Sequence, residues 1–295
     1  MVFFNGIRFL TPTTLAMQPA KTALWCLRLL CFCVFAGRAW QHLRWDAPYR
    51  ALLWSETFLA PVFERMGWQW QYWVSHSDVY IGKGIKATGV FFAVCAVASL
   101  VVNGKHRMGR YLLPAGGFML LLLALLYWKE KFFFTGELIE YSAQVICPFL
   151  LYALLYHHTT SEKLMLAGLV AVSLTFIGHG LFAIGYYPVP GNFQQMMVNF
   201  FGLPETVARR WLFYAGVMDM VVAAGIFVAR LRPPLLVYAA CWGFITAFAR
   251  LVANYDAHIP LYWLNLWLFE TLVRIPNGGL PVFLMLVGWE KGKNE

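Results

Sequence analysis

Phe35-Ala36-Gly37-Arg38 and Phe176-Ile177-Gly178-His179 are two similar stretches that stand 141 residues apart in this chain. After each of them the same features follow in the same order: apolar segments, glycines, carboxylates and prolines. Such ordered self-similarity indicates an internal repeat. Duplicated membrane folds often place their functional groups where the two copies meet, so the pattern predicts a fold and also the position of a site.

The last apolar segment of each half carries the most detailed match. Glu137 precedes Pro148 by 11 residues, and Glu270 precedes Pro281 by 11. The positions four and seven residues after each glutamate are also polar, and together these positions lie on one helix face; they are Tyr141, Gln144, Arg274 and Asn277. Gly89-Val90 and Gly216-Val217 form a further matching pair.

The composition is that of an integral membrane protein. Hydrophobic residues make up 60% of the 295 residues and charged residues 13%, with a mean hydropathy of +0.61. This leaves too little polar surface for a soluble globule. The net charge of +9 comes from basic residues at the ends of apolar runs, as in helix anchors, so nucleic-acid binding is not expected.

The apolar runs predict an all-α polytopic fold with eight transmembrane helices, arranged as two four-helix repeats. The predicted spans are 23–41, 86–102, 111–128, 138–156, 164–186, 211–229, 234–253 and 268–288. The predicted parts are an N-terminal tail (1–22), a first repeat (23–158) with an interfacial segment (42–85), a second repeat (159–289) with an interfacial segment (187–210), and a C-terminal tail (290–295). Four spans per copy is an even number, so the copies are expected to share one orientation.

Basic residues in short loops favour cytoplasmic termini in a bacterial inner membrane. Lys105, Arg107, Arg110, Arg230 and Arg232 outweigh the loop 254–267. A cleaved signal peptide is not expected, and Met1 and Met17 are both candidate starts. Arg28, one turn into the first span, is expected to extend to the lipid headgroups.

Ionisable side chains inside spans are costly and usually face the bundle interior or a cavity. In the predicted topology the outer half of the membrane holds Arg38, His42, Glu137, Glu140, His179, Arg250, Glu270 and Arg274, with Asp219 nearer the middle. One interpretation is a structural network of ion pairs between helices. The other is a site, in which His179 and Asp219 handle protons while Arg38, Glu140, Arg250, Glu270, Arg274 and Asn277 bind a substrate.

Pro276 to Pro281 is expected to interrupt the last span and free backbone carbonyls there. Such interruptions in membrane helices often mark a ligand pocket, although a simple proline kink is the alternative. His157-His158 has no nearby acid or cysteine, so no metal site is expected. No Walker, dinucleotide, nucleophile-elbow or zinc-helix motif occurs in the sequence, and no covalently bound cofactor is expected.

The chain resembles the DoxX-like membrane family. The resemblance rests on Leu27-Arg28, Phe35, Gly37 and Leu43 in the first copy, and on Phe176-Ile177-Gly178-His179-Gly180-Leu181 and Gly216-Val217-Met218-Asp219 in the second. The first copy departs from the family pattern, with Arg38 in place of the histidine and Phe92 in place of the acid. A looser resemblance, to the membrane domain of the vitamin-K-dependent carboxylase group, rests on aromatic, Arg-bearing first helices.

The DoxX-like resemblance implies a four-helix unit and a quinone-linked redox or proton-handling role, with a soluble or membrane redox partner. Some members of the family are membrane subunits of thiosulfate:quinone oxidoreductase. Two alternatives stay open. One is a transporter of a small anion or lipid-like solute, and the other is a non-catalytic assembly or cargo-handling protein that docks its partner on the Trp-rich segment 42–85.

Overall fold

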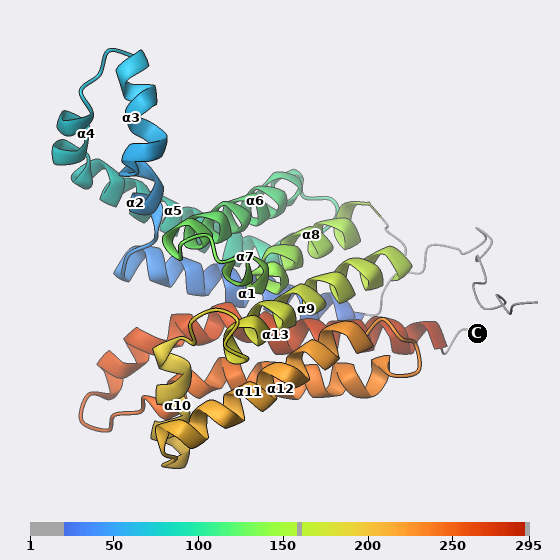
Figure 1. Ribbon diagram of the computed structural model, residues 1–295. Helices are drawn as coiled ribbons and strands as arrows, with labels where there is room; N and C mark the ends of the chain where they lie inside the picture. Colours follow the sequence, from blue (N-terminus) through green and yellow to red (C-terminus); the bar gives the residue numbers. More distant parts are fainter. Residues whose placement is uncertain (1–20, 158–160, 293–295) are drawn as a thin grey trace, which may run out of the picture.

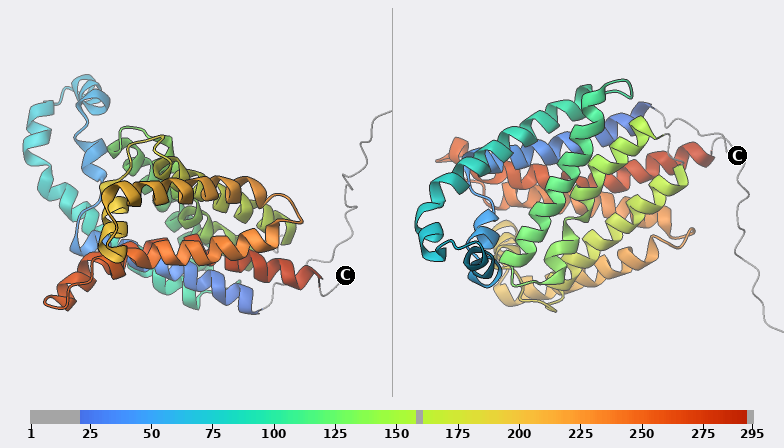
Figure 2. Two further views of the ribbon diagram at one scale, coloured as in Figure 1. Left: turned by 60° about the horizontal axis from the view of Figure 1, so that its bottom comes forward. Right: turned by 90° about the horizontal axis from the view of Figure 1, so that it is seen from above.

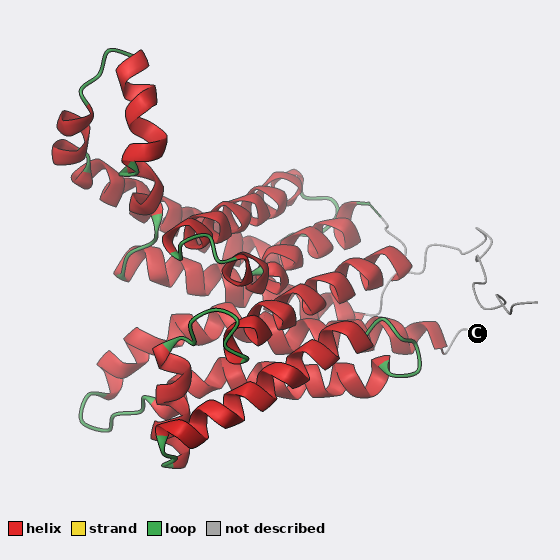
Figure 3. Ribbon diagram, viewed as in Figure 1, coloured by secondary structure: helices red, strands yellow, loops and turns green. Residues whose placement is uncertain are grey.

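The computed structural model describes residues 21–157 and 161–292, and every regular element in these ranges is a helix (Figures 1 and 3). Residues 1–20 of the predicted tail (1–22), with both candidate starts, lie outside the described residues, as do 158–160 and 293–295. The helices are α1 (Lys21–Arg44), α2 (Tyr49–Leu53), α3 (Glu56–Arg65), α4 (Trp70–His76), α5 (Asp78–Val101), α6 (Arg107–Glu130), α7 (Thr135–Glu140), α8 (Ser142–Tyr156), α9 (Ser161–Ala183), α10 (Gly191–Phe201), α11 (Glu205–Gly225), α12 (Arg232–Ala253) and α13 (Pro260–Gly292).

The long helices run side by side in one bundle (Figures 1 and 2). Seven stretches are long and apolar enough to cross a membrane: α1, α5, α6, α7 with α8, α9, α12 and α13. The prediction of an all-helical membrane protein is therefore confirmed at this level. Helix α11 also runs along the bundle, but it carries Glu205, Arg209, Arg210 and Asp219 and is not one of the seven.

Helix α1 joins two parts of the bundle. It packs mainly against α5 and α13, and its buried face includes Leu27, Val34 and Phe35, each fully removed from solvent. The Phe35 ring stacks on Phe92 of α5, with 6.0 Å between the ring centroids. The short helices α2, α3, α4 and α10 gather at one end of the bundle, and the two ends of the described chain lie at the other (Figure 1).

The segment 42–85 is more helical than expected. Helices α2, α3 and α4 occupy most of it, and α5 begins at Asp78 rather than at residue 86. The helix of the second span therefore begins eight residues before the apolar run 86–102 from which the span was predicted. Segment 187–210 similarly contains α10 and the first turns of α11. Polar residues in these helix ends, such as Asp78 and Lys83, concealed the helix in the hydropathy pattern.

The expected interruption of the last span is wrong, because α13 continues as a helix through Pro276 and Pro281. Pro281 has no N–H to bond to the Asn277 carbonyl four residues earlier. That carbonyl faces α12 at Gly243, where an added Cβ would lie 2.5 Å from its oxygen. Close packing against a neighbouring helix therefore shields the freed carbonyl, and the chain does not need to unwind.

Arg28 does not extend to the headgroups as expected, and is only 6% exposed. Its guanidinium group donates hydrogen bonds to the carbonyl oxygens of Ser99 (3.0 Å), Leu100 (2.8 Å) and Val102 (2.5 Å). These are among the last carbonyls of α5, which have no partner within their own helix. Arg28 therefore caps the end of α5 and joins it to α1.

Replacing Arg28 with methionine is expected to lower the free energy of unfolding by about 2–4 kcal/mol, because three carbonyl groups lose a charged donor. Arg28→Lys should fall between methionine and the native residue, since an ammonium group cannot reproduce the planar fork. Unfolding by sodium dodecyl sulfate in mixed micelles measures the loss. The exposed Arg107 gives a control, Arg107→Met, which is expected to change little. Equal curves for the two methionine variants would refute the capping role.

Candidate functional site

A close approach of α9 to α7 builds the centre of the site. An added Cβ on Gly178 would lie 2.7 Å from the Gly136 carbonyl oxygen and 2.8 Å from the backbone nitrogen of Glu140. Only glycine fits at this distance, because the obstructing atoms belong to the backbone. The contact brings Glu140 beside His179, the residue that follows Gly178.

His179 lies between groups from two other helices. Its Nδ1 atom is 3.7 Å from Glu140 Oε2 on α7, and its Nε2 atom is 3.2 Å from Asn277 Nδ2 on α13. Since the amide nitrogen can only donate, Nε2 accepts and a neutral His179 carries its proton on Nδ1, toward the carboxylate. The distance to Glu140 suits an ion pair or one bridging water rather than a direct hydrogen bond.

Glu270 joins two arginines next to this group. Arg274, one turn further along α13, donates to the Glu270 side chain at 2.5 Å and to its carbonyl oxygen at 3.0 Å. Arg250 of α12 places Nη1 3.6 Å from the same carboxylate oxygen. Both arginines lie near enough to act electrostatically on Glu140 and His179. One charged cluster therefore spans α7, α9, α12 and α13. Its members are Glu140, His179, Arg250, Glu270, Arg274 and Asn277.

Arg38 of α1 borders the charged cluster from the other side. Its guanidinium group donates to Gln41 and Gln144, both at 2.8 Å, and lies over the rings of Tyr127 (5.5 Å) and Tyr141 (5.3 Å). These two rings stack on each other with 5.3 Å between centroids. The side chain is 3% exposed, yet its Nε atom has no hydrogen-bond partner among the described residues. Arg38 thus retains one free donor.

The turn between α6 and α7 sets the position of Tyr141 against Tyr127. Helix α6 ends with a hydrogen bond from Phe133 N to Trp128 O (2.8 Å), the six-residue closure of a Schellman motif. Phe132 and Phe133 both have positive φ, 53° and 60°. This conformation is unfavourable for aromatic residues, so the turn holds backbone strain of about 1 kcal/mol or more per residue.

His42, which is fully buried, ties α1 to α2 at the same end of the bundle. Its Nδ1 atom lies 2.7 Å from the Arg38 carbonyl oxygen, and Nε2 is 3.2 Å from the Tyr49 hydroxyl. Burial raises the pKa of Tyr49, which is outside the spans, so its hydroxyl keeps its proton and can donate to Nε2. Both ring nitrogens of His42 therefore have hydrogen-bond partners within the fold.

Arg50 forms two ion pairs at the same end of the bundle. It bridges Asp46 (2.7 Å) and Asp78 (2.8 Å). Burial lowers the pKa of Arg50, but hydrogen bonds and charge from Asp78 and Asp46 outweigh it and leave the pKa raised. These three charged side chains mark a polar boundary at the start of α5.

Asp219 lies apart from the charged cluster. It is 4% exposed on α11, packed against Gly180 of α9, where an added Cβ would lie 3.3 Å from Asp219 Cβ, and beside Trp242 of α12. Within residues 21–157 and 161–292, no hydrogen bond or ion pair joins it to His179. Its Oδ1 atom has no partner there either. His179 and Gly180 are neighbours in sequence but face different helices, so the carboxylate beside His179 is that of Glu140 rather than that of Asp219.

The structure thus brings together seven of the eight predicted site residues: Arg38, Glu140, His179, Arg250, Glu270, Arg274 and Asn277. Sequence reasoning missed Gln41 and Tyr127. Gln41 stands three residues after Arg38, on the same helix face, and this spacing was an available signal. Tyr127 ends an ordinary apolar run and gave none. No group of three or more side chains suited to a metal ion occurs in the described ranges.

Comparisons with protein-family models, curated protein sequences and solved structures find no match for this chain. The geometry of the charged cluster is therefore the basis on which a function is proposed.

Proposed function

We propose that this chain is a proton-handling membrane subunit linked to quinone redox chemistry, with Glu140 and His179 as the proton-exchanging pair. The single observation that carries the proposal is the placement of His179 between a carboxylate and an amide inside a helix bundle. A histidine beside a carboxylate can pass a proton between that carboxylate and a hydrogen-bonded ligand. Arg250 and Arg274 make their ion-pair contacts with Glu270, whereas the ion-pair contact of Glu140 is with His179.

The unpaired polar atoms at the charged cluster fit the oxygen atoms of a quinone. Arg38 Nε is a buried donor without a partner among the described residues, and Asn277 Oδ1 is a buried acceptor without one. A carbonyl oxygen of the quinone pairs with the first, and a hydroxyl group of the reduced quinol pairs with the second. When bound, a quinone supplies two-electron, two-proton redox chemistry. The protein's own part is then to orient the headgroup through Arg38 and Asn277 and to exchange protons through His179.

We also propose that the fold consists of two DoxX-like four-helix units and eight spans, with α11 as the sixth. Reciprocal contacts support this. Gly178 packs on α7 at Gly136 and Glu140, and Gly37 packs on α13 at Phe269 and Val273, its counterparts in the other half. The hydrogen-bonded pair Arg38 with Gln144 likewise corresponds to His179 with Asn277.

A second set of equivalent contacts supports the same arrangement. An added Cβ on Gly89 of α5 would meet His42 and Leu43 of α1 at 3.0 and 2.9 Å. On Gly216 of α11 it would meet Ala183 and Ile184, at 2.9 and 2.8 Å. Ala183 and Ile184 stand 141 residues after His42 and Leu43, so α11 packs on α9 as the apolar α5 packs on α1.

The proposed setting is a bacterial inner membrane with both termini cytoplasmic. The loops that carry Lys105 and Arg230 lie at the same end of the bundle as the ends of the described chain (Figure 1). Under the positive-inside rule this end faces the cytoplasm, and the charged cluster then lies in the outer half. The continuous course of α13 removes the interrupted last span as support for a transporter, which would also use Arg38, Arg250 and Arg274.

Quinone retention tests the proposal directly. Protein purified in mild detergent is extracted with organic solvent, and quinone per chain is measured from the absorbance difference between oxidised and reduced extracts. We expect close to one quinone per chain, and a loss of about tenfold in affinity for His179→Ala and for Asn277→Leu, since each removes a buried polar partner. Ser173→Ala is the matched control, because Ser173 is buried on α9 and donates only to Ala223 O.

His179→Gln separates binding from proton exchange. A glutamine keeps a hydrogen-bonding group but cannot titrate, so this variant should retain quinone and lose thiosulfate-dependent quinone reduction in membranes. Absence of quinone from the native protein, or equal content in His179→Ala and Ser173→Ala, would rule out the proposed role.

A further inference from the structure

Arg38 is a buried cation that has no acidic partner in the described parts of the chain. Its side chain is 3% exposed, and no carboxylate oxygen of those residues lies within 4.0 Å of its guanidinium nitrogens. Arg250 and Arg274 differ in this respect, because they share the carboxylate of Glu270. An arginine keeps its charge in proteins, so the charge on Arg38 stands without a counter-ion.

The groups in contact with the Arg38 guanidinium are polar but uncharged. Gln41 and Gln144 each accept a hydrogen bond from it at 2.8 Å, and the rings of Tyr127 and Tyr141 lie 5.5 and 5.3 Å away. The Gln41 amide nitrogen donates to the Tyr127 hydroxyl, which fixes the amide with its oxygen toward Arg38. Neutral amides and aromatic faces offset only part of the cost of taking a guanidinium group out of water.

The fourth span is interrupted at the point where Arg38 contacts it. Helices α7 and α8 are separated by Tyr141, which is the cap residue of both. In a continuous helix the Ala143 N–H would bond to the carbonyl oxygen four residues earlier. Here it donates to the Thr175 hydroxyl of α9, at 3.0 Å. The fourth span therefore contains the start of a helix inside the bundle.

Arg38 stands at this start of α8. Gln144, which accepts from Arg38, is the third residue of α8, and the guanidinium group lies over the ring of the cap residue Tyr141. The start of a helix carries partial positive charge, so a cation there is unfavourable and an anion is favourable. In membrane proteins, interrupted helices direct such ends at anionic groups of their substrates. Arg38 and α8 thus both favour a negative charge beside Tyr141.

Arg38 also has the hydrogen-bond donor that an anion needs. Its Nε atom is buried and has no partner among the described residues. The two glutamates of α7 have other partners. Glu140 Oε2 lies 3.7 Å from His179 Nδ1, and Glu137 accepts from the Tyr141 hydroxyl at 3.4 Å. A free guanidinium N–H next to a positive helix end is an arrangement that binds oxyanions.

We propose that the ligand oxygen at Arg38 carries a negative charge, so that the site selects an acidic, ionised quinone over a neutral one. The inference rests on the function proposed above, since it concerns the same ligand and the same Arg38 Nε atom. In an ionised hydroxyquinone the negative charge is shared between the hydroxyl oxygen and a ring carbonyl oxygen. The carbonyl oxygen that pairs with Arg38 is then itself partly negative, and the hydrogen bond is charge-assisted on both sides.

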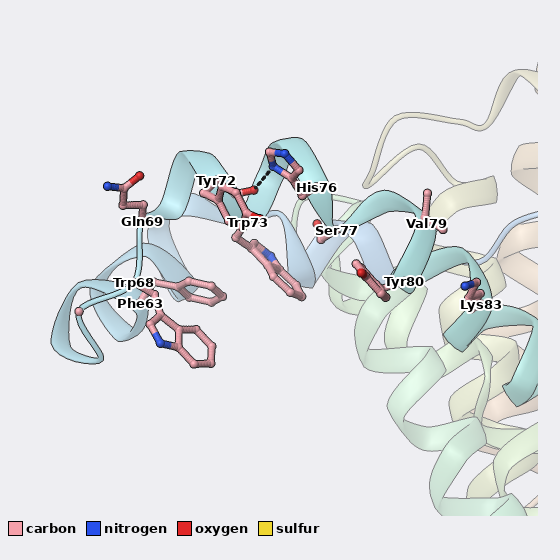
Figure 4. A pocket seen from close by; sticks show the side chains of 11 residues that line it. Phe63, Trp68, Gln69, Tyr72, Trp73, His76, Ser77, Val79, Tyr80 and Lys83 are labelled. Carbon is pink, nitrogen blue, oxygen red and sulfur yellow. Dashed lines mark hydrogen bonds between the residues drawn. The ribbon is translucent and has the colours of Figure 1, made fainter.

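Another part of the fold could also hold a flat anionic ring. A groove of about 870 Å³ lies outside the bundle, between residues 63–77 and the start of α5. Phe63, Trp68 and Tyr72 contribute aromatic rings to it, and Lys83 contributes a cation (Figure 4). Aromatic probes can stack on such rings, so the binding experiment needs a variant that separates this groove from Arg38.

Two matched probes test the inference. Lawsone is a hydroxynaphthoquinone whose ring hydroxyl is ionised at neutral pH, and its methyl ether has the same ring without the charge. Binding of each to the full chain, purified in detergent and stripped of quinone, is measured by equilibrium dialysis. We expect lawsone to bind about tenfold more tightly than the ether, since a hydrogen bond between two charged groups is stronger than one to a neutral oxygen.

Gln144→Glu is the decisive variant, because glutamate has the shape of the native glutamine and supplies the missing counter-ion. The affinity ratio of the two probes should fall from about ten to about one, while resistance to sodium dodecyl sulfate stays at least as high as in the native chain. Arg38→Met should also lose the preference, and Arg38→Lys should keep part of it, since the charge remains. Lys83→Gln is the control for the groove and should leave the ratio unchanged.

The outcomes separate this inference from the quinone proposal. Equal affinities of the two probes in the native chain, an unchanged ratio in Gln144→Glu, or a ratio that falls only in Lys83→Gln would overturn the inference, and the quinone proposal would still stand on its own retention test. Displacement of lawsone by an equal concentration of benzoate, an anion without a quinone ring, would support the negative charge at Arg38 and count against the quinone.

Discussion

Gly178→Ala is expected to destabilise the protein by about 2–3 kcal/mol and to disrupt the charged cluster. The added methyl group would lie 2.7 Å from the Gly136 carbonyl oxygen and 2.8 Å from Glu140 N. Backbone atoms cannot rotate away as a flexible side chain can, so α7 and α9 must separate. Separation lengthens the distance between Glu140 and His179, and both stability and quinone retention should fall.

The control for this variant is Gly84→Ala. Gly84 is also helical, but no atom lies within 4 Å of its added Cβ. Alanine there should be neutral or stabilising by up to about 1 kcal/mol, as in any exposed helix interior. Gly37→Ala should resemble Gly178→Ala, since its Cβ would lie 2.7 Å from Val273 Cγ1 and 3.0 Å from the Phe269 carbonyl oxygen. Identical unfolding curves for Gly178→Ala and Gly84→Ala would contradict the packing argument.

Glu270→Gln is expected to lower the free energy of unfolding by about 3–5 kcal/mol, because Arg250 and Arg274 would then face each other without the carboxylate between them. Glu270 retains part of its exposure, with 29% of its side chain accessible, so the lower end of that range is the better expectation. Unfolding by sodium dodecyl sulfate in mixed micelles measures it. Glu64→Gln, on the exposed face of α3, serves as the control.

A double variant identifies the cause of this loss. Arg250→Met removes one of the two arginines that Glu270→Gln leaves unpaired, so the double variant should be less destabilised than the sum of the two single variants. An additive result would mean that Glu270 and Arg250 act independently, and the shared ion pair would then be wrong.

The sequence was sufficient to predict the helical membrane class, because long apolar runs have few other solutions in lipid. It was less reliable where polar residues interrupt a helix. Asp78 and Lys83 concealed the start of α5, and Pro276 and Pro281 suggested a break that packing against Gly243 prevents. Hydropathy describes each residue alone, whereas helix continuity depends on the neighbouring helix.

Most of the charged cluster was predictable because ionisable residues inside spans must face one another. The individual partners were not. The sequence placed His179 and Asp219 on adjacent helices, yet Gly178 turns His179 toward Glu140 while Gly180 meets Asp219. Successive residues on a helix point about 100° apart, and only tertiary packing decides which direction meets which helix.

Under the proposed two-repeat architecture, the reciprocal packing of Gly37 on α13 and of Gly178 on α7 has an evolutionary consequence. In each half, the first helix packs against the last span of the other half. An ancestral protein with a single unit would therefore have had to form a homodimer. Once the two copies were joined in one polypeptide, their sequences could diverge. The first copy could then keep Arg38 hydrogen-bonded to Gln144, while the second placed His179 beside Glu140.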